Sequence, residues 1–83
     1  MRKKEEKLVV TFHTTADAMA MERLCRKTGA PGRLIPVPRE ISAGCGLAWC
    51  APLMSREKLR ELLTRAELEE EAMHVCMLLR DVY

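Results

Sequence analysis

The order in which strand-like and helix-like segments alternate along this 83-residue chain restricts it to few folds. Four segments have the apolar and β-branched composition of strands: residues 7–13, 33–37, 46–51 and 73–82. Two segments carry apolar side chains at helical spacing: residues 16–27 and 56–68. The resulting order β-α-β-β-α-β predicts an α+β fold, a ferredoxin-like sandwich in which two helices cover one face of a four-stranded antiparallel sheet. A helix is the alternative for residues 73–82.

Capping residues set the expected bounds of both helices. Thr14 occupies the N-cap position of the first helix, Asp17 the capping-box position, and Gly29 can end the helix in the left-handed conformation. Ser55 is the expected N-cap of the second helix, after Pro52 breaks the preceding strand. These signals predict two separate helices, each placed between strands.

A chain of this length forms one domain, residues 1–83, whose first six residues are expected to be a charged and flexible leader. A domain of this size buries only about 60 % of the surface of its unfolded chain, which leaves its stability marginal. Self-association through an open sheet face would bury more surface, so the sequence leaves room for a homodimer. Residues 67–71, an acidic connector, are expected to form a solvated turn.

Charge and hydropathy argue against two classes of partner. The net charge of +2 is too weak a bias to indicate nucleic-acid binding without a stacking platform. No segment approaches the roughly 20 apolar residues that span a membrane, and the charged N-terminal residues do not resemble a signal peptide. The protein is therefore expected to be cytoplasmic, where its cysteines stay reduced.

Cys45 is the candidate reactive residue. Gly44 and Gly46 flank it and deprive it of side chains to pack against, so its thiol is expected to be accessible. A nearby cation such as Arg39 and the amides of a glycine-flanked turn stabilise the nucleophilic thiolate. The alternative is that Cys45 is a small apolar side chain that fills the turn.

Three further residues define the expected setting of this thiol. Pro36 and Pro38 each lack an amide donor and fix φ, which indicates an extended segment at the end of a strand. Ser42 begins the Ser-Ala-Gly-Cys-Gly turn. We expect these residues, with Arg39, to shape the turn and the anion environment around Cys45.

The remaining candidates each have a functional and a structural interpretation. Cys50 is a second thiol that can pair with Cys45 if the strand curls back, or a packed strand residue. His13, at the end of the first strand, can shuttle a proton to Cys45 or merely cap the strand. Cys25 and Cys76 have apolar neighbours and are expected to be structural.

The sequence lacks the motifs of several enzyme classes. No two cysteines have the Cys-x-x-Cys spacing of zinc sites, so neither a metal nor another cofactor is expected. There is no Ser-His-Asp set for hydrolysis and no phosphate-binding loop. Hydrolytic catalysis therefore finds no support in the sequence.

Two blocks, residues 11–22 and 32–49, resemble a small family of bacterial selenium/sulfur carrier-like proteins. The second block is specific, because it joins Pro-x-Pro-Arg to Ser-x-Gly-Cys-Gly. The resemblance implies that Cys45 is a carrier thiol, which takes a sulfane sulfur or selenium atom from a donor protein as a persulfide and passes it to an acceptor protein. The neighbouring glycines would form its turn, and the prolines and the arginine its frame. The resemblance thus implies a carrier protein rather than a stand-alone enzyme.

Other functions stay open at this point. The chief alternative is a non-catalytic ligand-binding or regulatory module of the ferredoxin-like type that dimerises through its sheet. A thiol redox protein with a disulfide between Cys45 and Cys50 is another alternative. A metal site built from these two cysteines and a histidine is the least favoured.

Overall fold

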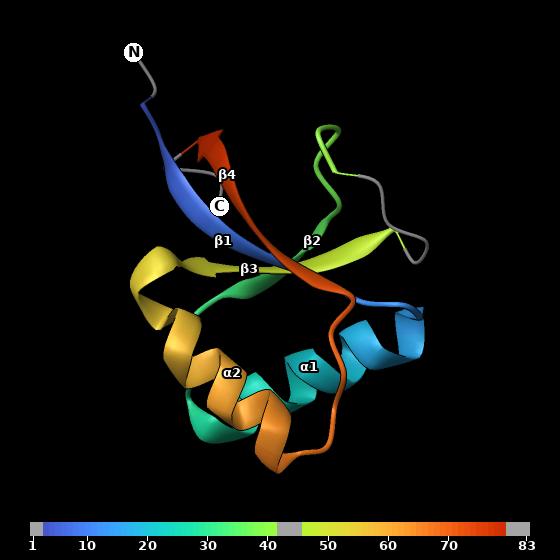
Figure 1. The fold of residues 1–83 in the computed structure, drawn as a ribbon. Coiled ribbons are helices and arrows are strands. Elements are labelled where there is room, and N and C mark those ends of the chain that lie inside the picture. Colours follow the sequence, from blue (N-terminus) through green and yellow to red (C-terminus); the bar gives the residue numbers. More distant parts are fainter. Residues whose placement is uncertain (1–2, 42–45, 80–83) are drawn as a thin grey trace.

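The computed structural model describes residues 3–41 and 46–79 of the chain. Its elements are β1 (Lys4–Thr11), α1 (Thr15–Thr28), β2 (Arg33–Pro36), β3 (Leu47–Pro52), the 3₁₀ helix η1 (Leu53–Ser55), α2 (Arg56–Arg65) and β4 (Ala72–Leu79). The four strands form one antiparallel sheet in the order β2-β3-β1-β4, and both helices cover the same face of it (Figure 1). The predicted ferredoxin-like α+β arrangement is therefore confirmed.

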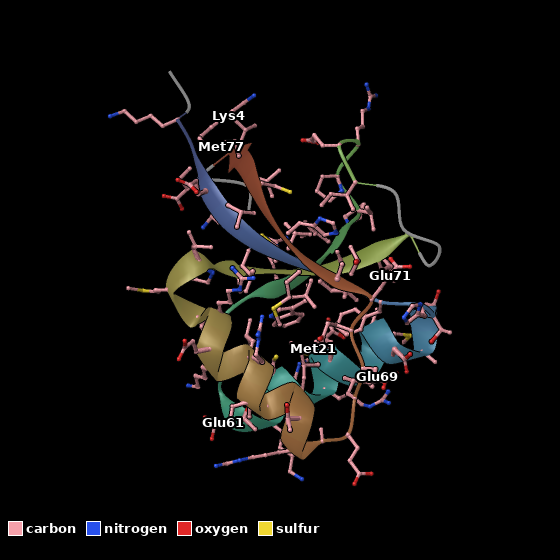
Figure 2. All side chains as sticks on the ribbon, viewed as in Figure 1. Lys4, Met21, Glu61, Glu69, Glu71 and Met77 are labelled. Atoms are coloured by element: carbon pink, nitrogen blue, oxygen red, sulfur yellow. The ribbon has the colours of Figure 1, made fainter. Side chains whose placement is uncertain are left out.

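The main core lies between the sheet and the helices. Leu8 and Val10 on β1 and Phe12 just after it are fully buried there. Met21 from α1, labelled in Figure 2, and Leu59 from α2 belong to the same core. Replacing a fully buried leucine such as Leu59 by alanine costs about 2–5 kcal/mol, so this layer fixes the helices on the sheet.

The opposite face of the sheet carries a second buried cluster. Its members are Val9, Ile35, Ala48, Cys50, Cys76 and Leu78. Val37 and Ile41, from the segment after β2, pack against this second cluster. The sequence predicted an open sheet face available to a second copy of the chain, but the central side chains of this face are buried.

Both helices start where the capping residues predict, but only the first has the predicted side-chain cap. The Thr14 hydroxyl accepts a hydrogen bond of 3.1 Å from the Asp17 amide, and Gly29 ends α1 at φ +76°. Ser55 is the residue directly before α2, as predicted, but its side chain makes no capping hydrogen bond to the described backbone. The chain already turns in η1, so Ser55 has helix-like angles (φ −87°, ψ 2°) where an N-cap is usually extended. Neither helix in residues 3–41 and 46–79 is long and apolar enough to cross a membrane.

Within the described residues, the bounds that differ most from the sequence prediction are the start of β1 and the end of α2, and the other strand bounds differ by at most two residues. β1 begins at Lys4, inside the predicted leader, because it pairs there with Leu79 of β4. α2 ends three residues before its predicted end, because Glu67 adopts φ +55° and the Leu68 amide bonds to the Leu63 carbonyl at 3.0 Å. This bond completes a left-handed helix end in which a glutamate takes the place usual for glycine.

Candidate functional site

The loop between β2 and β3, residues 37–46, is closed at its base. The Val37 amide donates a hydrogen bond of 3.0 Å to the Gly46 carbonyl, one step beyond the last β2–β3 pair. Gly46 has φ +75°, a left-handed conformation that glycine adopts without steric cost. The position directly after Cys45 therefore favours a glycine.

The part of the loop nearer β2 folds as a turn beside the second cluster. The Ile41 amide donates a hydrogen bond of 3.0 Å to the Pro38 carbonyl. Ile41 and Val37 pack against the second cluster, whereas Arg39 and Glu40 between them are exposed. This turn thus has an apolar side toward the sheet and a charged side toward solvent.

Three of the predicted site residues, Ser42, Gly44 and Cys45, lie outside the described residues, so their roles stay predictions. Pro36 is the exposed last residue of β2, and Pro38 is half-buried in the turn that follows. Both positions suit residues without an amide donor, because the strand ends there. The described part of the site is therefore the base of the loop and its first turn.

The three described cysteines, Cys25, Cys50 and Cys76, are all buried. Burial raises the pKa of Cys25 to about 11, and burial together with the Glu40 carboxylate raises the pKa of Cys76. A thiol must ionise to become a nucleophile, so neither of these two is activated at neutral pH. Both positions agree with the structural role expected of them.

Cys50, the predicted second thiol, lies in the middle of β3 on the face opposite the helices. Burial raises its pKa, although the Lys7 and Arg33 cations lower it in part. Three steps of extended strand, about 10 Å, separate Cys50 from Leu47 at the start of β3. A disulfide with Cys45 would require the loop to bring that residue within about 7 Å of the middle of the strand.

His13 and Gly46 leave the sheet at the same end. The β1–β3 ladder stops at Thr11 and Ala48, and His13 and Gly46 each lie two residues beyond this pair. His13 is exposed, and its Nδ1 atom lies 3.7 Å from Oε2 of Glu71, which is labelled in Figure 2. The histidine is thus at the loop end of the sheet, and its transfer of a proton to the loop thiol stays a prediction.

Glu71 is the residue at this end that sequence reasoning missed. The sequence assigned it to a solvated acidic turn. In the structure its amide donates a hydrogen bond of 2.7 Å to the Thr11 carbonyl, which fixes it beside the end of β1. Its carboxylate is therefore placed to orient the His13 ring. No local pattern indicates this contact, because it depends on how β4 pairs with β1.

A family described as "Putative Se/S carrier protein-like" matches residues 7–75, from β1 into β4. The chain belongs to this family. The Se/S carrier-like match extends beyond the two blocks that carried the resemblance, and it takes in both helices and the whole loop. Neither the curated proteins nor the solved structures yield a match to the chain.

In this Se/S carrier-like protein, the described part of the site has two components. One is the closed base of the loop with the exposed Arg39, and the other is the pair formed by His13 and Glu71. Among the described residues, no three His, Cys, Asp or Glu side chains lie close enough together to hold a metal ion. The described residues thus offer a cation and a proton acceptor, and their action on the Cys45 thiol stays a prediction.

Proposed function

We propose that the protein carries a sulfane sulfur or selenium atom on Cys45 and passes it from a donor protein to an acceptor protein. Membership of the Se/S carrier-like family supports this class of cargo. The observation that carries the assignment to Cys45 is the burial of the other three thiols, each with a raised pKa. Cys45, between two glycines of the loop, is the thiol that remains.

The transfer needs no net oxidation or reduction. The Cys45 thiolate attacks the terminal sulfur of a persulfide on the donor, a new S–S bond forms, and the donor cysteine leaves as a thiolate. A nucleophile of the acceptor then attacks the terminal sulfur of the Cys45 persulfide and restores the Cys45 thiolate. A selenium atom follows the same steps as a selenopersulfide. The protein is thus a carrier whose partners supply and consume the cargo.

Two described side chains support the anionic states of this cycle. Arg39 is exposed on the outer side of the loop, where a guanidinium stabilises a thiolate or persulfide anion. His13, beside Glu71 at the loop end of the sheet, can accept the proton that the Cys45 thiol releases. A carrier of this kind is suited to the reducing cytoplasm, where a free thiol persists.

Intact-mass spectrometry tests this proposal. The reduced protein is incubated with a cysteine desulfurase and cysteine, beside the variants Cys45→Ser and Cys50→Ala. We expect one added sulfur atom on the parent and on Cys50→Ala, and none on Cys45→Ser. Repeating the experiment with selenocysteine and a selenocysteine lyase tests whether selenium is carried as well.

Each other outcome points to a different function. Equal loading of Cys45→Ser, with its fold retained by circular dichroism, would contradict the carrier role of this residue. Loss of loading in Cys50→Ala as well would indicate a relay between two thiols. A parent that loads from neither donor, and whose Cys45 is alkylated slowly at neutral pH, would favour the non-catalytic ligand-binding or regulatory module.

A further inference from the structure

β4 forms an edge of the sheet that is unprotected against pairing. It pairs with β1 on one side, and within residues 3–41 and 46–79 no strand pairs with its other side. Its sequence over Ala72–Leu79 contains no Lys, Arg, Asp, Glu, Pro or Gly, whereas edge strands are usually blunted by charges, prolines or bulges. The opposite edge, β2, is half as long, begins at Arg33 and ends at Pro36. β4 is therefore the edge suited to receive another strand.

Two apolar side chains on this strand are exposed. Val75 is 46 % exposed and Met77 53 % exposed. They alternate along β4 with the buried Cys76, so they lie on the face that carries the helices. Neither belongs to the buried clusters of the described residues, and Figure 2 shows Met77 on the part of β4 that extends beyond the helices. Unpaired backbone beside exposed apolar side chains favours association.

We propose that a second copy of the chain pairs with β4, antiparallel and about a two-fold axis near Val75, so that the two sheets join into one. This pairing is self-complementary, because Val75 lies opposite Val75 of the second copy and Met77 opposite Met73 of the second copy. The backbone groups of both edges gain hydrogen-bond partners, and the exposed apolar side chains cover each other. No two like charges face each other across the seam, since β4 contains no Lys, Arg, Asp or Glu.

The strand order makes this dimer compatible with an accessible loop. β2 and β4 are opposite edges of the sheet, so pairing through β4 leaves the base of the loop, at Val37 and Gly46, near an outer edge of each copy (Figure 1). Face-to-face association is disfavoured by contrast, since Val37 and Ile41 pack onto the second cluster of the helix-free face. An edge-paired dimer thus adds buried surface to a small domain without covering the base of loop 37–46.

Sedimentation velocity tests the pairing. We expect the molar mass obtained for the parent to be that of a dimer, twice the chain mass of 9.5 kDa. Val75→Lys should sediment as a monomer at the same concentration. The variant should weaken dimerisation about tenfold or more, because two lysines would face each other across the seam. Met54→Lys is the matched control: Met54 is 90 % exposed on η1, so its replacement should leave the dimer unchanged.

Cross-linking gives a second readout that does not depend on charge. Val75→Cys places two thiols opposite each other at a Cα separation of about 5.5 Å or less, so oxidation should join the two copies. Met54→Cys should cross-link no more than the parent. A parent that stays monomeric at every concentration, a dimer that persists in Val75→Lys, or a Val75→Cys dimer that does not cross-link would each overturn the proposal.

Discussion

The Val37 amide and the Gly46 carbonyl are joined by a hydrogen bond of 3.0 Å that closes loop 37–46 at its base. It holds Gly46, with φ +75°, at the point where the chain re-enters the sheet. The loop is therefore tied to both β2 and β3, and we expect changes at its base to affect the thiol that it carries.

Gly46→Ala should destabilise the fold by about 1 kcal/mol, because an L-residue at positive φ is strained. Among the described residues, a Cβ atom there would meet nothing within 4 Å, so the expected effect is conformational and not steric. Gly29→Ala is the matched control, since Gly29 has φ +76° and equally open surroundings at the end of α1. Urea denaturation should show similar losses, and only Gly46→Ala should change the rate at which iodoacetamide labels Cys45. Equal labelling in the two variants would contradict a specific role of the loop base.

Gly32→Ala should cost more, about 2–4 kcal/mol, because strain and overpacking act together at this position. A Cβ atom at Gly32 would overlap the indole nitrogen of Trp49 and lie 2.6 Å from the Cys50 carbonyl oxygen, and the backbone has φ +128°. The indole would be displaced from its 3.3 Å hydrogen bond to the Pro31 carbonyl. Urea denaturation followed by tryptophan fluorescence measures the loss. A midpoint equal to that of Gly29→Ala would show that the site tolerates a side chain.

Alkaline pH should destabilise the fold through Cys25. Burial raises the pKa of this thiol from 9.0 to about 11, so the unfolded chain ionises before the folded one. The contribution to stability is therefore fully present below pH 9.0 and is lost as the pH rises toward about 11. Urea midpoints across this window should fall for the parent and fall less for Cys25→Ala. Parallel slopes for the two proteins would contradict a buried, protonated Cys25.

The pair formed by His13 and Glu71 should affect the rate of sulfur loading and not its stoichiometry. His13→Asn removes a proton acceptor at the loop end of the sheet, so loading of Cys45 should slow several-fold near neutral pH. Glu71→Gln should cause a smaller loss, because it removes only the carboxylate 3.7 Å from the ring. Glu69→Gln changes an exposed glutamate of the same connector and serves as the control. Time courses by intact-mass spectrometry compare the four proteins, and a parental pH–rate profile in His13→Asn would rule out the shuttle.

The order of the elements is predictable from the sequence because each element carries its own apolar pattern. Residues 8–10, for example, form a continuous apolar run, and all three are buried, Leu8 and Val10 in the main core and Val9 in the second cluster. What the sequence does not predict depends on contacts between distant residues. Lys4 belongs to β1 because Leu79 lies opposite it, and Glu71 reaches His13 because β4 begins beside the end of β1.

Local signals have the same limit at shorter range. The capping role of Thr14 is predictable because its capping hydrogen bond is formed within three residues. Ser55 has a side chain suited to capping, but it follows η1, which sets its backbone angles. Glu67 adopts a φ of +55° that sequence rules reserve mainly for glycine and asparagine. In the site, the unusual backbone conformation of Gly46 is predictable from its place in a glycine-flanked turn. The burial of Cys50, by contrast, depends on the second cluster, whose members come from distant parts of the chain.

If Cys45 carries the cargo as proposed, the burial of Cys25, Cys50 and Cys76 limits that cargo to one atom per folded chain. A chain that has not yet folded presents all four thiols to the same donor and could be loaded at several positions. The number of sulfur or selenium atoms per molecule would then report how much of the population is folded. Burial of three thiols would thus ensure that a folded chain delivers a single atom to its acceptor.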